Sequence, residues 1–250
     1  MLGVPVDVVD MITALDFVHN YVNTPKNPPG FILAVNPEKV MCIRKDRKLK
    51  IFFEKATLLI PDGIGVVKAL HLFGHKNAGR VTGADLMQNI CRQAPRENYR
   101  IFVYGAAEDV NRDACAELER RNPGIQIVGR SNGYVKAEEM EFLVEQINQS
   151  GADILFIALG SPAQERWLEQ HASKLTTVKI CQGIGGTLDT IVGKVKRAPL
   201  GWQKLGLEWL YRLVKQPKRI GRQLNLFYFV LLVLREKFST FIKGIKNLQR

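Results

Sequence analysis

Short clusters of apolar residues alternate along most of the chain with longer stretches in which apolar positions recur three or four residues apart. Such clusters are typical of buried strands, and the stretches between them are typical of helices. A chain that alternates the two forms an α/β domain around a mostly parallel sheet. The predicted strands span residues 31–35, 58–60, 100–104, 125–128, 154–158 and 178–181.

Two of the stretches between strands have a clear helical period. Residues 109–121 and 137–149 are rich in Glu and carry apolar residues at positions i, i+3 and i+4. The second stretch is preceded by Lys136 and followed by Ser150 and Gly151, which fits a helix that begins and ends there. We therefore expect a Rossmann-like sheet flanked by helices.

Three predicted strands lead within two residues into a glycine, at Gly105, Gly160 and Gly183. In open α/β sheets, tight turns at the carboxyl ends of strands let backbone N–H groups and helix N-termini face a phosphate. The sequence therefore predicts a phosphate-bearing ligand at this edge of the sheet, with Gly105 among the residues that bind it.

Asp62 stands between Pro61 and Gly63, after a predicted strand and before an apolar helical stretch. Two interpretations are open. As a helix N-cap, its carboxylate would accept hydrogen bonds from the first helical turn. As a general base, it would lie at the ligand-binding edge with a pKa adjusted by partial burial.

A second junction, residues 180–189, is dense in glycine. It is not the dinucleotide fingerprint, because Leu188 stands where GxGxxG requires its third glycine. Either the backbone closely approaches a phosphate or sugar here, or the segment is a plain tight turn. The candidate binding residues are Gly185, Gly186, Thr187 and Asp189.

A capping box is predicted where residues 159–167 begin a helix, with Ser161 as N-cap, Pro162 at N1 and Gln164 at N3. Local structure alone accounts for Ser161 and Pro162. First-turn side chains at this place face the crevice at the strand ends, so Gln164 and Glu165 are candidates for substrate binding.

The composition changes after Gly193. Residues 194–250 carry 14 Lys and Arg against two Asp and Glu, whereas residues 1–193 carry 22 of each, so the tail accounts for the net charge of +12. Two helices are predicted, at residues 203–215 and 221–238, joined near Pro217. We divide the chain into an α/β core, residues 1–195, and a basic helical appendage, residues 196–250.

The appendage also contains an apolar run, residues 224–234, which is shorter than the roughly twenty residues that a membrane-spanning helix needs. This run can lie in a membrane surface or pack on a core, but it should not cross the bilayer. Basic and apolar residues together predict contact with an anionic membrane surface. The basic side chains include Arg212, Arg219 and Arg222. They form either a solvated face that attracts lipid or a set of guanidinium groups, some of which reach a diphosphate.

Other binding partners are disfavoured by the sequence. The four cysteines and four histidines do not cluster, and no DxD pair is present to hold a metal on a nucleotide diphosphate, so we expect neither metal nor cofactor. Nucleic acid is disfavoured because the basic tail lacks aromatic residues interleaved for base stacking. The first thirty residues show no export signal, which predicts a cytoplasmic protein.

Taken together, the motifs resemble the WecG/TagA/CpsF glycosyltransferase family over about residues 3–222. One departure is Ala34, where family members often have threonine. The matching stretches are residues 36–38 (NPE), 61–67 (PDGIGVV), 80–86 (RVTGADL), 158–165 (ALGSPAQE), 183–189 (GIGGTLD), 193–199 (GKVKRAP) and 203–213 (QKLGLEWLYRL).

The resemblance implies an inverting, metal-independent transferase of the GT-E fold that moves a sugar from a UDP-sugar to an undecaprenyl-diphosphate-linked sugar. N-acetylmannosamine in teichoic acid synthesis is one such sugar. By the same resemblance Asp62 is the base and Gln164 contacts substrate. The remaining implied binding residues are Asn36 and Arg80 in the core and Arg212, Arg219 and Arg222 in the appendage.

This mechanism fits the division of the chain into core and tail. An in-line displacement needs a base on the acceptor hydroxyl and positive charge on the departing UDP, on opposite faces of the sugar. We expect the enzyme on the inner face of the bacterial membrane, with closure of the tail coupled to catalysis. Its oligomeric state stays open. The main rival is a non-catalytic nucleotide- or lipid-binding protein at the membrane.

Overall fold

The computed structural model of the chain contains a six-stranded parallel sheet. It describes all residues except 25–27, 200, 203–205, 216–219 and 249–250, and only the backbone of residues 212, 215, 220–224 and 240–248. The spatial order of the strands is β2-β1-β6-β5-β3-β4. The strands are β1 (Gly30–Val35), β2 (Leu58–Pro61), β3 (Arg100–Gly105), β4 (Gln126–Ser131), β5 (Ile154–Ala158) and β6 (Ile180–Gly183).

These strands confirm the predicted α/β class and each of the predicted strands, with shifted ends. β4 continues to Ser131 because it pairs with β3 as far as Tyr104. β6 begins at Ile180, two residues later than predicted, and ends at Gly183. The central strands β5 and β6 are buried along their whole length, as expected inside a parallel sheet.

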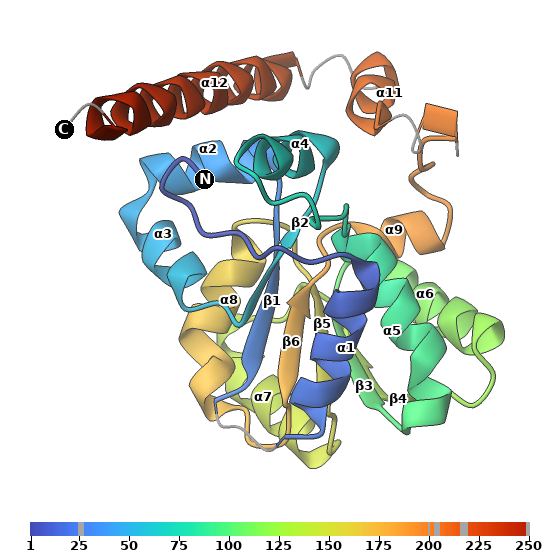
Figure 1. The fold of residues 1–250 in the computed structure, drawn as a ribbon. Coiled ribbons are helices and arrows are strands. Elements are labelled where there is room, and N and C mark those ends of the chain that lie inside the picture. The colour runs from blue at the N-terminus through green and yellow to red at the C-terminus, as the bar shows by residue number, and fades with distance from the viewer. Residues whose placement is uncertain (25–27, 200, 203–205, 216–219, 249–250) are drawn as a thin grey trace.

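Right-handed crossovers decide which helices cover each face of the sheet. Four helices lie in connections whose next strand is nearer the β2 edge, and these four cover one face of the sheet. Helices α5 and α6 lie in connections whose next strand is nearer the β4 edge, and they cover the other face together with α1 and α9 (Figure 1). The first face has α2 (Pro37–Lys45), α3 (Arg47–Glu54), α7 (Met140–Gln149) and α8 (Ala163–His171). The second has α1 (Met11–Val22), α5 (Gly83–Glu97), α6 (Glu108–Arg121) and α9 (Thr187–Ile191).

Both helices predicted between strands are present. The first is α6, which begins one residue before its predicted start. The second starts with a short 3-10 turn (Ala137–Glu139) and continues as α7, and another 3-10 turn (Ala172–Lys174) follows α8. Each face of the sheet has its own apolar core, so the domain is a three-layer, Rossmann-like sandwich.

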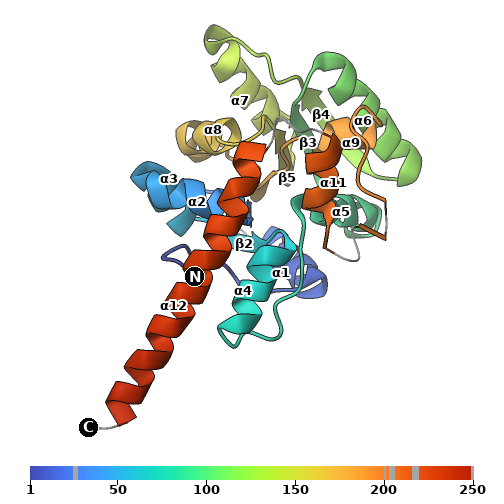
Figure 2. The same cartoon turned by 90° about the horizontal axis from the view of Figure 1, so that it is seen from above.

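The appendage lies across the edge where the strands end. Its helices are α11 (Glu208–Lys215) and α12 (Ile220–Leu248), and α12 crosses over α2 and α4 (Ile64–Leu72) in both views (Figures 1 and 2). Phe229 and Val233 of α12 are buried in the same core cluster as the side chains of α2 and α3. The backbone N–H of Leu2 also donates to Glu236 Oε2 at 2.8 Å, which ties the start of the chain to α12.

The tail helices differ from their predicted limits. The last helix does not end at residue 238 but runs to Leu248, because residues 239–248 keep apolar positions at helical spacing and contain no proline. Of the helix predicted at residues 203–215, the described part begins at Glu208, and Pro217 lies outside the described residues. Within the described part of the chain, no helix combines the length and apolarity needed to cross a membrane.

Candidate active site

The carboxyl edge of the sheet brings together residues from distant parts of the sequence. Asn36 follows β1, Asp62 follows β2, Gln164 lies in the first turn after β5, and the loop around Gly185 follows β6. Since β2, β1, β6 and β5 are consecutive neighbours in the sheet, these residues line one continuous rim. The structure thus places four separate predicted positions at the edge where α/β proteins bind ligands.

Asp62 is half-buried at this rim and is not the N-cap residue of the helix that follows it. Its backbone N–H donates to the carbonyl of Val35 at 2.9 Å, which fixes the start of the turn after β2. The N-cap of α4 is Gly63, with a φ of 101°, and it has no side chain that could cap this helix. The N-cap interpretation of Asp62 is therefore wrong, and its role as a base stays a prediction.

Gln164 links the ends of β5 and β6. Its Oε1 accepts a hydrogen bond from the backbone N–H of Gly185 at 3.1 Å, and its side chain is buried. A Cβ at Gly183 would overlap the Gln164 amide, so only glycine leaves room for this contact. Gly185 has a φ of 53°, in the left-handed region that glycine adopts readily. The amide therefore holds the glycine-rich loop in place.

The predicted capping box at Ser161 is wrong. Helix α8 begins at Ala163 after Pro162, no side chain caps it, and Gln164 stands at its second position rather than its third. The Ser161 hydroxyl instead accepts a hydrogen bond from the ammonium group of Lys39, which belongs to another helix. The expectation that Gln164 turns toward the strand ends is nevertheless confirmed by its bond to the β6 loop.

Lys39 is a residue that the sequence analysis missed. Asn36 caps α2 by accepting from the backbone N–H of Lys39 at 2.8 Å, which directs the first turn of α2 toward α8. There, Lys39 Nζ lies 2.6 Å from Glu165 Oε1, and the two side chains are only 12% and 3% exposed. Glu165 is thus part of a buried ion pair between two helices of the rim. The Lys39 ammonium also lies 5.5 Å from the ring centre of Phe53.

The other predicted binding residues near the rim mostly make contacts with the backbone of the core. Thr187 is buried and donates from Oγ1 to the Ile184 carbonyl at 2.5 Å, while Gly186 is exposed. The Asp189 carbonyl accepts from Val195 N–H at 3.1 Å. Gly105 has a φ of 118° and packs so closely on the Ala158 backbone that a Cβ would not fit. Contact of these residues with a substrate stays a prediction.

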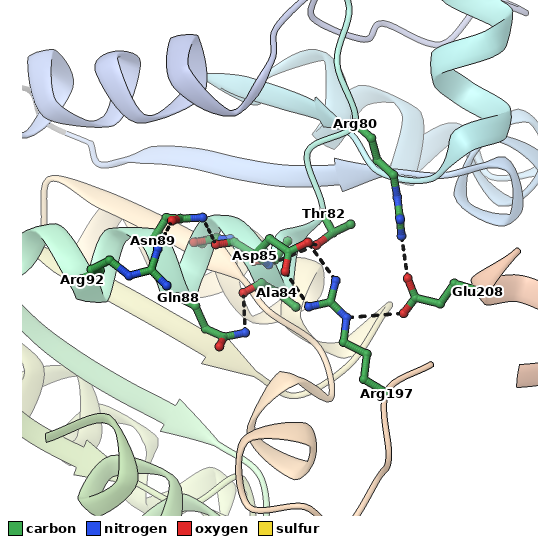
Figure 3. A network of polar contacts seen from close by, with 11 residues as sticks. Arg80, Thr82, Ala84, Asp85, Gln88, Asn89, Arg92, Arg197 and Glu208 are labelled. Atoms are coloured by element: carbon green, nitrogen blue, oxygen red, sulfur yellow. Dashed lines mark hydrogen bonds and ion pairs between the residues drawn. The ribbon is translucent and has the colours of Figure 1, made fainter. Parts of the chain in front are cut away.

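Four charged side chains meet where the appendage leaves the core (Figure 3). Arg80 Nη2 lies 2.6 Å from Glu208 Oε2, and Arg197 Nε lies 3.6 Å from Glu208 Oε1. The two terminal nitrogens of Arg197 donate to both carboxylate oxygens of Asp85 at 2.5 and 2.8 Å. The Thr82 hydroxyl donates to Asp85 as well, at 2.7 Å.

These contacts change the ionisation of the cluster. Burial raises the pKa of Asp85, but hydrogen bonds from Arg197 and Thr82 outweigh burial and hold this pKa below its ordinary value of 3.8. The Asp85 carboxylate in turn raises the pKa of Arg197, and the charges of Glu208 and Asp62 contribute in the same direction. Asp85 and Arg197 are therefore stabilised as ions at neutral pH.

Asp85, Arg197 and Glu208 were not singled out as candidates by the sequence analysis, although each stands in a stretch that matches the family. A signal was present for Asp85, because Thr82 and Asp85 have the spacing of a helix-capping pair, and the structure shows Thr82 as the N-cap of α5. No local pattern could have paired Arg197 with it, since 112 residues separate the two.

The predicted appendage arginines are described only in part. Arg212 belongs to α11 and Arg222 to α12, but their side chains lie outside the described part of the structure, as does Arg219 altogether. Among the described residues, no group of three or more His, Cys, Asp or Glu side chains is arranged to hold a metal ion.

A comparison with family models relates the chain to known proteins. The model of the glycosyl transferase WecG/TagA/CpsF family matches residues 1–242, almost the whole chain. The chain belongs to this family. It is accordingly a glycosyltransferase of cell-surface polysaccharide synthesis, and membership implies a nucleotide-sugar donor and a lipid-linked acceptor in general.

Proposed function

We propose that this glycosyltransferase moves an N-acetylmannosamine-type sugar from a UDP-sugar to an undecaprenyl-diphosphate-linked sugar, by inversion and without a metal. The observation that carries the proposal is the placement of Asp62. Asp62 is half-buried at the rim directly after β2, and its charge helps to raise the pKa of Arg197.

In the proposed reaction, Asp62 accepts the proton of an acceptor hydroxyl while that oxygen forms a bond to the anomeric carbon of the donor. The bond from this carbon to the UDP oxygen breaks, and UDP leaves with the bonding electron pair. Positive groups on the opposite side of the sugar stabilise the charge that develops on UDP. Arg80 and the appendage arginines Arg212, Arg219 and Arg222 are the side chains that we assign to this task.

We also assign the exposed face of α12 to the cytoplasmic face of the membrane. Phe227, Leu231, Leu234 and Phe238 are all more than half exposed, and their spacing of four, three and four residues puts them on one stripe of the helix. With basic residues nearby, such a stripe favours an anionic lipid surface. Peripheral binding of this kind would bring the rim to a lipid-linked acceptor.

The test is to incubate the protein with a panel of UDP-sugars and a short-chain lipid-diphosphate sugar, and to measure released UDP and product mass. Asp62→Asn should keep the fold and the affinity for UDP but lose roughly a hundredfold or more in turnover. Asp109→Asn, at an exposed helix position, is the matched control. Near-normal turnover of Asp62→Asn would remove the base assignment. UDP binding without any product would favour the non-catalytic rival.

A further inference from the structure

We propose that Asp85, Arg197 and Glu208 are positioning residues that form an ionic latch, which fixes the appendage on the core and orients the Arg80 guanidinium. The inference rests on the proposed function, because Arg80 and Asp62 take their roles from it. The latch itself consists of described side chains from three separate segments: the first turn of α5, the connection that follows α9, and the first residue of α11.

The first half of the latch joins the connection to the core. Arg197 and Asp85 form a bidentate pair, in which two parallel N–H donors match two carboxylate oxygens. Thr82 holds Asp85 from the other side, through its hydroxyl and as the N-cap of α5. The orientation of the Arg197 guanidinium is therefore set by the core, before any contact with the appendage is considered.

The second half joins this guanidinium to the appendage. The Glu208 carboxylate bridges Arg197 and Arg80, and its side chain is only 11% exposed. A carboxylate in such a place is costly to bury unless cations neutralise it. Glu208 therefore favours one position of α11 on the core. The same ion pair favours the orientation of the Arg80 guanidinium that reaches Glu208.

Packing around the latch acts on the segment that carries Asp62. Gly206, two residues before Glu208, has a φ of 71° and lies so close to Ile64 that an added Cβ would be 3.0 Å from its side chain. The next residue of α4, Gly65, lies close to Leu226 and Phe229 of α12, since an added Cβ would be 3.5 and 3.8 Å from their side chains. The appendage is thus packed against the first turn of α4, the helix that begins shortly after Asp62.

Together these contacts connect the position of the appendage to the geometry of the rim. When Glu208 is in place, Arg80, Arg197 and the start of α4 are all held. When it is removed, two guanidinium groups lose a shared counter-ion and α11 loses its strongest described polar contact with the core. Misplacement of reacting groups by about 1 Å is enough to lower turnover by roughly a hundredfold.

The experiment compares Asp85→Asn and Glu208→Gln with the intact chain. A matched control exists in the same connection: Lys194 pairs with Asp109, but both side chains are about half exposed, so Asp109→Asn removes an ion pair that is not part of the latch. Three quantities are measured: hydrogen exchange of the α11 amides, affinity for UDP, and turnover on a short-chain acceptor.

We expect both latch variants to speed exchange in α11 by about tenfold or more and to lower kcat by about tenfold to a hundredfold, with UDP affinity changed less than about threefold. Asp109→Asn should change none of these. Arg197→Lys, which keeps the charge but loses the fork, should be intermediate.

Several results would overturn the latch. If the α11 amides of the variants exchanged faster while kcat stayed the same, the latch contacts would stabilise the structure without affecting catalysis. If hydrogen exchange did not change, the latch would not hold the appendage on the core. Tighter UDP binding by Glu208→Gln would show that Glu208 competes with the donor instead of positioning Arg80. If the intact chain transferred no sugar at all, the proposed function would fail first, an outcome distinct from a loss seen in the variants alone.

Discussion

Replacing Phe229 by alanine should release α12 from the core, whereas the same change at Phe227 should not. Phe229 is 1% exposed and packs among the side chains of α2 and α4, while Phe227, two residues earlier on the same helix, is 62% exposed. Truncating a buried Phe costs about 3–5 kcal/mol. Truncating an exposed one changes stability by no more than about 0.5 kcal/mol.

A loss of about 3 kcal/mol in the docking of α12 corresponds to roughly a hundredfold faster hydrogen exchange of its amides, and this is the assay. The opposite order is expected for flotation with anionic liposomes. Phe227→Ala removes lipid-facing area worth about 1.5–3 kcal/mol and should bind about tenfold to a hundredfold more weakly, while Phe229→Ala keeps its lipid contact. Equal effects of the two variants in both assays would refute the assignment of a core side and a lipid side to α12.

Three further changes test the rim. Gly183→Ala should cost about 1–3 kcal/mol in urea unfolding, because its Cβ displaces the Gln164 amide. Glu165→Gln should cost about 3 kcal/mol by leaving the Lys39 ammonium buried without a counter-ion, and adding Lys39→Met should recover most of it. For Asp85, whose folded-state pKa is depressed, stabilisation is complete above the unfolded pKa of 3.8 and is lost as the pH falls through the lower, folded value. The difference in unfolding free energy between wild type and Asp85→Asn should therefore shrink below about pH 4 and stay constant near neutrality.

Strand positions could be predicted because each depends on a local run of apolar residues, and 154–158 is buried from end to end as its composition required. Placement of the rim followed from topology, since parallel strands end on one side. What could not be predicted depended on distant partners. Ser161 fits a helix cap by local pattern, yet Lys39 from another helix holds its hydroxyl. Arg197 reads as one basic residue among many until the fold brings it to Asp85.

The same limit applies to the last helix. The apolar run at residues 224–234 predicted either burial or lipid contact, and the structure divides the run between core-facing and exposed positions. Phe229 and Val233 have a spacing of four residues and face the core, whereas Phe227 and Leu231 have the same spacing and are exposed. Periodicity shows that a helix has two apolar sides, but only the body beneath it decides which one is covered.

The burial of Phe229 and Val233 against α2 and α4 has a practical consequence for shortened versions of the protein. Cutting the chain before α12 would expose an apolar surface that α12 covers in the intact protein. This surface includes Leu2, which is buried and whose backbone N–H is hydrogen-bonded to Glu236. Such a fragment would tend to aggregate. If it failed to float with vesicles, aggregation and not a loss of lipid affinity would be the cause. Point changes on the outer stripe are the cleaner way to separate lipid adhesion from folding.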